Sequence, residues 1–256
     1  MSEINNQKAT VSAANNSDVN FNYVSTVQNK GQKHLKQHRQ NLPFSVVEAY
    51  KNIRTSLLSL IDKTDIKVLA FSSPDASEGK STTSMNVAMA ISQLNKKVLL
   101  LDTDSLHPTL NKIINRPNDK GCVDIISGAA ALESVIINYA PYLDIITAGN
   151  RPSNSTELFD SAEFEKILAE LKKQYDYIIV DTPPINLISD SLIIAKKCDA
   201  LVLIVCSSVT KYNSLSKALS SIGILKINLL GTIINRVNLS SKKYYKYNYK
   251  SYKYYY

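Results

Sequence analysis

Short apolar runs alternate with stretches of helical periodicity along most of this chain. Runs with the length and composition of buried strands occur at residues 67–72, 97–101, 142–146, 177–180, 200–206 and 229–234. Segments that favour helices lie around them, at 43–61, 80–94, 122–127, 131–138, 162–174, 188–197 and 210–222. Strands that alternate with helices predict right-handed crossovers, and hence an α/β fold with a mostly parallel sheet between helical layers.

The two ends of the chain lack this alternation. Residues 1–42 are polar and have no sustained period, which predicts a flexible N-terminal arm. After Val237 the composition changes abruptly, and residues 238–256 form a low-complexity tail rich in lysine and tyrosine. The sequence therefore predicts one folded domain, residues 43–237, between an arm and a tail.

The net charge of +8 is concentrated in the same two ends. Residues 1–42 contribute +3 and residues 237–256 contribute +5, so the middle of the chain is neutral. A nucleic-acid-binding domain carries its positive charge on a folded face, which argues against that class. Basic ends are typical of chains that meet a membrane surface or an acidic partner, although they also keep a chain soluble.

The sequence gives no sign of a membrane span or of secretion. Its apolar runs are far shorter than the roughly 18 residues of a spanning helix, and its first residues lack the basic-then-apolar pattern of a secretory signal. Cys122, Cys198 and Cys206 have no close spacing, which argues against a disulfide framework and against a zinc site. We therefore expect a cytoplasmic protein.

The loop after the first apolar run has the features of a phosphate-binding loop. Residues 72–81 lie where a strand ends and a helix begins, so free N–H groups and the helix dipole favour an anion. Gly79 lets the backbone approach a phosphate, Lys80 supplies positive charge to the β and γ groups, and the Ser81 hydroxyl can bind Mg²⁺. The residues expected to contact the nucleotide are Ser77, Glu78, Gly79, Lys80, Ser81 and Thr82.

Aspartates follow two of the apolar runs, at the edge of a parallel sheet where ligands bind. Asp102 and Asp104 end the second run, and two carboxylates one residue apart point to the same side of an extended chain. One can bind Mg²⁺ while the other accepts a proton from a nucleophile, and the sequence does not say which. Asp181, after the fourth run, is a further Mg²⁺ ligand candidate. Asn235, after the last run, either contacts adenine or belongs to a turn.

The segments Ser-Glu-Gly-Lys-Ser-Thr, Leu-Leu-Leu-Asp-Thr-Asp and Ile-Ile-Val-Asp-Thr-Pro-Pro, followed by a tyrosine cluster, resemble those of the bacterial tyrosine kinases. The resemblance covers roughly residues 43–256. Residues 121–128 and 149–158 are similar to the family's G-L-x-D-x-L-x-G and G-x-x-P-P-N-P-x-E-L segments. This resemblance implies a P-loop NTPase-like three-layer sandwich that uses ATP and Mg²⁺ to phosphorylate tyrosine.

The resemblance also implies partners. Such kinases of Gram-positive bacteria act in capsule and exopolysaccharide synthesis and export as separate chains at the inner face of the membrane. The cytoplasmic tail of a membrane adaptor, a polysaccharide co-polymerase, activates them, and a tyrosine phosphatase is a further expected partner. Family members form homo-oligomeric rings through an E-x-x-R-x-x-R motif. Glu48, Lys51 and Arg54 resemble it, and their spacing places them on one stripe of a helix, opposite most of its apolar residues.

Eight tyrosines lie among the last 13 residues, interleaved with lysine. Such a tail could stack on single-stranded nucleic acid or anchor at a membrane interface, but neither role explains its attachment to a Mg·ATP site. Exposed phenols on a flexible segment fit phosphate acceptors that enter another subunit's site. The expected acceptors are Tyr244, Tyr245, Tyr247, Tyr249, Tyr252, Tyr254, Tyr255 and Tyr256.

Several positions depart from the family pattern. Pro74 replaces the first glycine of the usual phosphate loop, Ser77 stands where glycine is common, and Leu106 replaces the arginine of D-x-D-x-R-x-P. Because the reacting lysine and aspartates are present, we expect an active kinase. One alternative is a partition- or division-type ATPase switch, disfavoured because Asp75 occupies the place of its signature lysine. Another is a catalytically weak regulatory partner of the polysaccharide machinery, suggested by the lost arginine.

Overall fold

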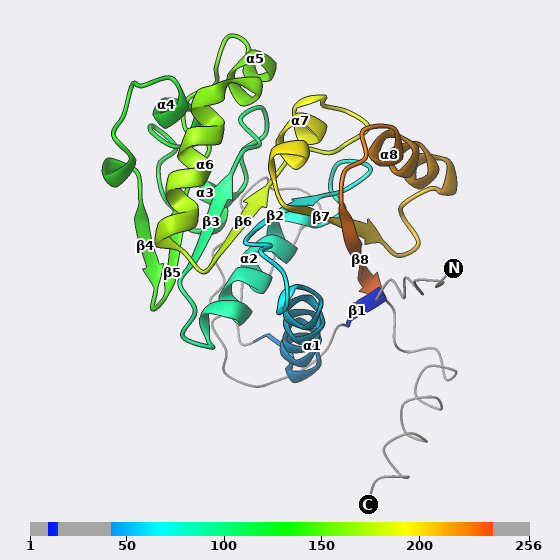
Figure 1. The fold of residues 1–256 in the computed structure, drawn as a ribbon. Helices are drawn as coiled ribbons and strands as arrows, with labels where there is room; N and C mark the ends of the chain where they lie inside the picture. The colour runs from blue at the N-terminus through cyan, green and yellow to red at the C-terminus, as the bar shows by residue number, and fades with distance from the viewer. Residues whose placement is uncertain (1–9, 15–41, 238–256) are drawn as a thin grey trace, which may run out of the picture.

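The structure is a computed structural model that describes residues 10–14 and 42–237, and these residues form one eight-stranded sheet (Figure 1). The strand order is β1-β8-β7-β2-β6-β3-β5-β4. All neighbouring strands are parallel except β4 and β5, which are antiparallel. The strands are β1 (Thr10–Ala14), β2 (Val68–Ser72), β3 (Val98–Asp102), β4 (Ile137–Ala140), β5 (Leu143–Ile146), β6 (Tyr177–Asp181), β7 (Ala200–Cys206) and β8 (Leu229–Val237).

Helices cover both faces of this sheet, so the predicted three-layer α/β fold is confirmed (Figure 1). The layer on one face contains α1 and α2, and the layer on the other contains α4 to α8. The helices are α1 (Phe44–Ile61), α2 (Lys80–Ser92), α3 (Leu110–Ile113), α4 (Cys122–Ile126), α5 (Ser155–Asp160), α6 (Ala162–Gln174), α7 (Asp190–Lys197) and α8 (Tyr212–Ile224), with a 3-10 turn, η1, at Leu132–Ser134.

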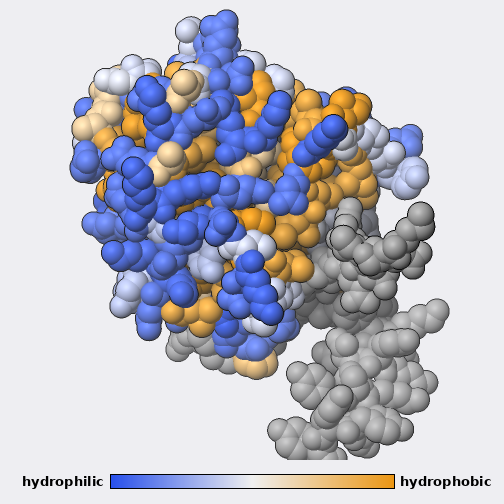
Figure 2. All heavy atoms as spheres, in the orientation of Figure 1, coloured by the Kyte–Doolittle hydropathy of each residue, from blue (hydrophilic) through white to orange (hydrophobic). Residues whose placement is uncertain are grey.

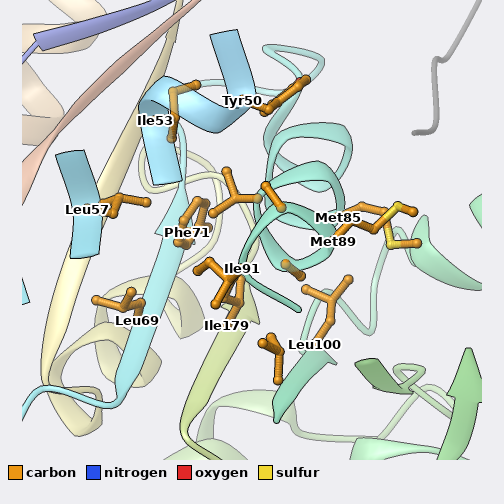
Figure 3. Close-up of a cluster of buried hydrophobic side chains, with 14 of the residues drawn as sticks. Tyr50, Ile53, Leu57, Leu69, Phe71, Met85, Met89, Ile91, Leu100 and Ile179 are labelled. Atoms are coloured by element: carbon orange, nitrogen blue, oxygen red, sulfur yellow. The ribbon is translucent and has the colours of Figure 1, made fainter. Parts of the chain in front are cut away.

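Alternate residues of each central strand enter opposite layers. In β2, Leu69 and Phe71 pack with α1 and α2, whereas Val68 and Ala70 pack against the other layer. Figure 3 shows the first cluster, in which apolar side chains of α1 and Ile91 of α2 lie against the sheet. Because β2 is buried on both faces, its sequence is a continuous apolar run, and this run predicted the strand.

Two parts of the structure differ from the prediction. A helix was expected at residues 131–138, but η1 is followed by β4, in which Ile137 pairs with Ile145 of β5. The β-branched residues at 135–137 favour a strand and outweigh the helical spacing. No strand was expected in the N-terminal arm, yet β1 pairs in parallel with β8. The rest of the arm, residues 1–9 and 15–41, lies outside the described residues.

The outer surface is mostly hydrophilic in the view of Figure 2, with hydrophobic residues exposed beside α7 and α8. Ile224 and Leu225, at the end of α8, belong to this exposed group. Within residues 10–14 and 42–237, no helix combines the length and the apolar character that crossing a bilayer requires.

Arg54 of α1 makes a contact within its own chain that the sequence did not predict. Its side chain is half-buried, and Nη1 donates a hydrogen bond of 2.9 Å to the carbonyl oxygen of Ala90 in the last turn of α2. Carbonyl groups at a helix C-terminus lack partners within the helix, and a cation there interacts favourably with the helix dipole. Arg54 therefore caps α2, whereas Lys51 and Glu48, which are also half-buried, form an ion pair of 2.7 Å.

We predict that Arg54→Met lowers the free energy of unfolding by about 1–2 kcal/mol, because it leaves the carbonyl group of Ala90 without its charged partner. Methionine retains the apolar stem of the side chain, so the loss reports on the hydrogen bond. Urea unfolding followed by circular dichroism measures it. The matched control is Arg116→Met at an exposed position, which should change stability by less than about 0.5 kcal/mol. Equal losses in both variants would contradict the capping role.

Candidate functional site

The phosphate-binding loop joins β2 to α2 and has a left-handed backbone at two positions. The φ angle is 63° at Ser77 and 91° at Gly79. A Cβ atom at Gly79 would lie 2.1 Å from Nδ2 of Asn235, so only glycine fits there. The same Nδ2 donates a hydrogen bond of 3.0 Å to the carbonyl oxygen of Glu78. The structure thus gives Asn235 a contact with the loop, while its contact with adenine stays a prediction.

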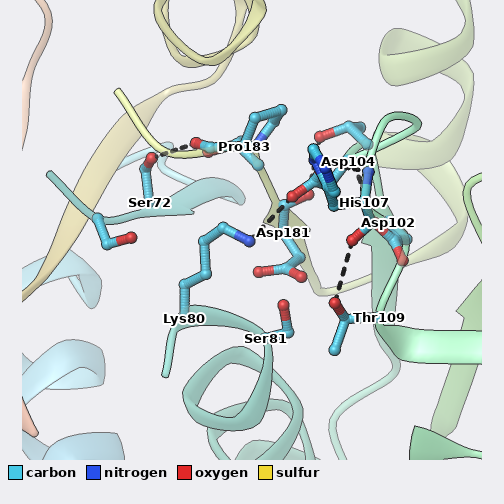
Figure 4. A network of polar contacts seen from close by, with 12 residues as sticks. Ser72, Lys80, Ser81, Asp102, Asp104, His107, Thr109, Asp181 and Pro183 are labelled. Carbon is cyan, nitrogen blue, oxygen red and sulfur yellow. Dashed lines mark hydrogen bonds and ion pairs between the residues drawn. The ribbon is translucent and has the colours of Figure 1, made fainter. Parts of the chain in front are cut away.

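Lys80 begins α2 and extends toward three aspartates (Figure 4). Its Nζ lies 3.0 Å from Oδ2 of Asp104, and both side chains are almost completely buried. Asp102 and Asp181 end the adjacent strands β3 and β6 and lie opposite each other in the register. Parallel strands carry their carboxyl ends to the same edge of the sheet. Residues from three separate segments of the sequence therefore meet in one buried site.

The two aspartates at the end of β3 also accept hydrogen bonds from the loop that follows this strand. Asp102 accepts hydrogen bonds from the N–H groups of Asp104 at 3.0 Å and Leu110 at 3.2 Å. Asp104 accepts a bond of 3.0 Å from the N–H of His107 through Oδ1, the oxygen that does not face Lys80. Both oxygens of Asp102 are therefore bonded to the backbone, whereas Asp104 presents one oxygen to the lysine.

Burial dominates the protonation equilibria of these groups. It raises the pKa of Asp102 to about 8, and the charges of Asp181 and Asp104 act in the same direction. It also raises the pKa of Asp181 to about 6, against the opposing effects of Lys80 and the Ser81 hydroxyl. Burial alone would lower the pKa of Lys80, but the negative charges of Asp181 and Asp104 outweigh it and leave that pKa raised. The lysine therefore stays protonated, whereas the neighbouring carboxylates disfavour one another's ionisation.

Asp181 fits a magnesium ligand. Within the described chain neither of its buried carboxylate oxygens has a hydrogen bond of normal geometry, although the hydroxyl groups of Ser81 and Ser84 lie close enough to lower its pKa. Figure 4 shows Ser81 beside this carboxylate. No cluster of three or more His, Cys, Asp or Glu side chains with a metal-binding arrangement occurs in residues 10–14 and 42–237. Mg²⁺ binds one or two protein oxygens together with substrate phosphates and water, and Asp181 with the Ser81 hydroxyl offers such oxygens.

The remaining predicted residues fall into three places. Ser81 and Thr82 lie in the first turn of α2, the former buried and the latter half-buried. The trio Glu48, Lys51 and Arg54 belongs to α1, away from the aspartates. The eight tail tyrosines lie outside the described residues.

Sequence reasoning missed residues that shape the site. The hydroxyl of Thr103 donates a hydrogen bond of 2.8 Å to the carbonyl oxygen of Asp181 and so joins the ends of β3 and β6. The hydroxyl of Thr210 donates to the carboxylate of Glu78. Thr103 lies between the two predicted aspartates, so its position carried a signal. Thr210 is 132 residues from its partner and belongs to no motif, so nothing in the sequence pointed to it.

Comparisons with known proteins agree with this geometry. A family model described as an AAA domain matches residues 66–229. The tyrosine-protein kinase CpsD of Streptococcus agalactiae is 36% identical over 199 residues, which are 77% of this chain and 86% of that protein. The tyrosine-protein kinase YwqD of Bacillus subtilis is 33% identical over 202 residues, 78% of this chain and 85% of that protein.

Solved structures show the same similarity. The kinase domain of the Escherichia coli tyrosine kinase ETK is 27% identical with a TM-score of 0.74, covering 82% of this chain and 87% of that one. The chimerical protein CapA2B2 is 29% identical with a TM-score of 0.72, covering 75% and 85%. A plasmid partition protein of Borrelia burgdorferi is only 21% identical with a TM-score of 0.53, covering 69% and 81%, which shows a shared fold alone.

We predict that Asp181→Asn stabilises the nucleotide-free protein at pH 8 by on the order of 1–2 kcal/mol, because it removes a buried, poorly bonded charge. The pKa of Asp181 is raised from 3.8 to about 6 in the folded protein, so the folded state binds the proton more tightly. The wild-type protein therefore regains stability through this group as the pH falls from about 6 toward 4, and the advantage of the variant shrinks over that range.

Urea unfolding between pH 4.5 and 8, in EDTA, measures this effect. Asp119→Asn, at an exposed position, is the matched control and should give a small difference that does not depend on pH. An advantage of Asp181→Asn that stays constant, or that grows on acidification, would show that Asp181 is not a strained buried carboxylate.

Proposed function

The chain belongs to the family of bacterial tyrosine kinases, and on this premise we propose that its buried site transfers the γ-phosphoryl group of ATP to a protein tyrosine. The observation that carries the proposal is the buried pair of Lys80 and Asp104 at the end of the phosphate loop. Lys80 Nζ and Asp104 Oδ2 lie 3.0 Å apart, and in this proposal they serve as the cation for the γ-phosphate and the acceptor for the phenolic proton. Phosphoryl transfer requires little more than such charges held in position.

In the transfer, the tyrosine oxygen forms a bond to the γ-phosphorus while the bond from that phosphorus to the β,γ-bridging oxygen breaks. ADP leaves with the electron pair of the broken bond, and the phenolic proton goes to a carboxylate. We assign that role to Asp104, because both oxygens of Asp102 are engaged with backbone N–H groups. Lys80 exchanges its contact with Asp104 for a phosphate oxygen, which frees the carboxylate to act as a base.

The residues around Asp181 complete the nucleotide site. Ser81 and Asp181 would hold Mg²⁺, and Asp102 and Asp104, which lie in the same site, would bind it through water (Figure 4). When bound, the ion supplies positive charge to the phosphate oxygens. The N–H groups at the start of α2 face the same phosphates, and Gly79 allows their close approach.

The proposed acceptors are the tail tyrosines between Tyr244 and Tyr256, which carry the phenols that a tyrosine kinase modifies. The 19 residues that follow Val237 span at most about 65 Å when extended, enough to enter the site of a neighbouring subunit. Each phosphate adds about −1.5 to −2 charges, so three would cancel the +5 charge of the tail. Phosphorylation would thereby end the attraction of the tail to acidic surfaces.

The same premise supports a cellular role in capsule or exopolysaccharide synthesis. We propose that the tail of a membrane adaptor recruits the chain to the inner face of the membrane and activates it, and that a tyrosine phosphatase resets it. The basic ends of the chain suit an anionic membrane surface. A partition-type switch is less well supported, because the relatives of 30% identity or more that are described above are named tyrosine kinases.

We predict that Lys80→Met abolishes autophosphorylation, since the loop then has no cation for the γ-phosphate. The assay incubates each protein with labelled ATP, Mg²⁺ and an adaptor-tail peptide, and mass spectrometry locates the phosphate. The control is Lys112→Met at an exposed position of α3, which should retain wild-type labelling. Wild-type protein that binds ATP without labelling tyrosine would identify the chain as the catalytically weak partner.

A mixing experiment tests transfer between subunits. Lys80→Met protein is combined with an active variant whose eight tail tyrosines are phenylalanine. Phosphate should appear on the tail of the inactive chain, because its acceptors can enter the intact neighbouring site. An unlabelled inactive tail, beside normal labelling of the wild-type protein alone, would restrict transfer to a chain's own site.

For assembly, we predict that the double variant Glu48→Ala and Lys51→Ala reduces the mass measured by light scattering in the presence of the adaptor tail. Arg54 is left intact because it caps α2 within its own chain. The matched control is Glu163→Ala with Lys166→Ala, another i,i+3 ion pair, on α6, which should leave the mass unchanged. If both double variants keep the wild-type mass, then Glu48 and Lys51 form an ordinary surface pair.

A further inference from the structure

The segment between β7 and α8 contacts the phosphate loop through Thr210. The Thr210 hydroxyl donates a hydrogen bond to Oε1 of Glu78 and accepts one of 2.8 Å from the N–H of Cys206, the last residue of β7. A hydroxyl has one proton to donate, so these two bonds fix its orientation. Thr210 therefore connects the end of a central strand to the loop that receives the nucleotide.

Glu78 is held at three points. Besides the bond from Thr210, its Oε2 accepts the N–H of Asp75 at 3.0 Å, which closes the loop on itself. Its carbonyl oxygen accepts the bond from Asn235 at the end of β8. The residue is 1% exposed, and its carboxylate accepts bonds from Thr210 and Asp75, with the Ser73 side chain close by. The Glu78 side chain thus acts on the shape of the loop.

That shape is one the sequence does not favour. The residues on either side of Glu78, Ser77 and Gly79, both have positive φ angles. Successive N–H groups in alternating right- and left-handed backbone make a concave anion site. A left-handed conformation is unfavourable for serine by about 1–3 kcal/mol, so surrounding contacts must maintain it. The bonds to Glu78 are in the right place to do so.

A second contact joins the phosphate loop to the chain that follows β7. The Ser214 hydroxyl, in the first turn of α8, donates to Oδ2 of Asp75. Asn186, in the loop after β6, donates from Nδ2 to the Ser214 carbonyl oxygen at 2.9 Å. Both carboxylates of the loop, Asp75 and Glu78, are therefore bonded to hydroxyl groups of the segment from Thr210 to Ser214.

We propose that Thr210 is a positioning residue for nucleotide binding, which acts through Glu78 to keep the phosphate loop in its binding shape. The proposal rests on the function given above only in taking the ligand to be ATP. Thr210 contacts neither Lys80 nor the aspartates through its two described bonds, so its loss should weaken nucleotide binding more than it slows transfer from bound nucleotide.

The test compares Thr210→Val with Thr210→Ser. Valine keeps the shape of the side chain and removes the hydroxyl, and the dissociation constant of a fluorescent ATP analogue with Mg²⁺ should rise about tenfold. The labelling rate at saturating ATP should stay within about twofold of wild type. Serine keeps the hydroxyl and should restore the affinity to within about twofold.

The matched control is Thr156→Val, which removes a similar bond of 2.7 Å from a threonine hydroxyl to Oδ1 of Asp190, between α5 and α7. It should lower the melting temperature without changing nucleotide affinity. A Thr210→Val protein that loses stability as this control does, with unchanged affinity, would reduce Thr210 to a structural role.

Glu78→Gln provides an independent variant if Thr210→Val does not fold. The two donors contact different oxygens of Glu78, and glutamine replaces one of these oxygens with an NH₂ group that cannot accept a hydrogen bond. One of the two bonds is therefore lost, and affinity should fall about threefold. Unchanged affinity here overturns the proposal. Because the readout is binding, a wild-type protein that binds nucleotide but phosphorylates no tyrosine would refute the kinase function and leave the role of Thr210 standing.

Discussion

The buried contact between Lys80 and Asp104 is the interaction on which the rest of the site depends. Three buried aspartates lie at or just beyond the ends of two adjacent strands. Burying several carboxylates together is unfavourable unless their negative charge is compensated. Lys80 is the nearest cation, and the carboxylates raise its pKa in return. The sheet brings the aspartates together, and the lysine of the phosphate loop offsets part of their negative charge.

Helix α2 transmits this requirement through the domain. Its N-terminus carries Lys80 and the free N–H groups that face a phosphate, and its middle is buried among apolar residues of α1 and the sheet. At its C-terminus, Arg54 of α1 caps the carbonyl group of Ala90. Positive charge at one end and an anion site at the other both agree with the helix dipole. α1 thus stabilises the nucleotide site from the far end of α2, even though it contributes nothing to the aspartate cluster.

Sequence alone predicted the elements and residues whose signal is local. The central strands are buried on both faces and read as apolar runs, and Asp102, Asp104 and Asp181 could be placed because each follows such a run. Contacts between distant segments have no local sequence signal. The bond of Thr210 to Glu78 and the cap that Arg54 provides depend on how helices and loops pack. β4 was missed because a strand of four residues, three of them partly buried, fits a helical spacing as well as a strand pattern.

The nucleotide-free arrangement also restrains its own chemistry. While Lys80 is paired with Asp104, the proposed base is occupied by the cation that the γ-phosphate needs. In the mechanism that we propose, a phosphate that enters the loop draws the lysine away, and the carboxylate then accepts a phenolic proton. Removing the lysine leaves three carboxylates less compensated, which favours Mg²⁺ beside Asp181 at the same moment. In this mechanism nucleotide, metal and base are coupled through one side chain, so we expect a tyrosine that arrives before ATP to meet a carboxylate that is still paired with Lys80.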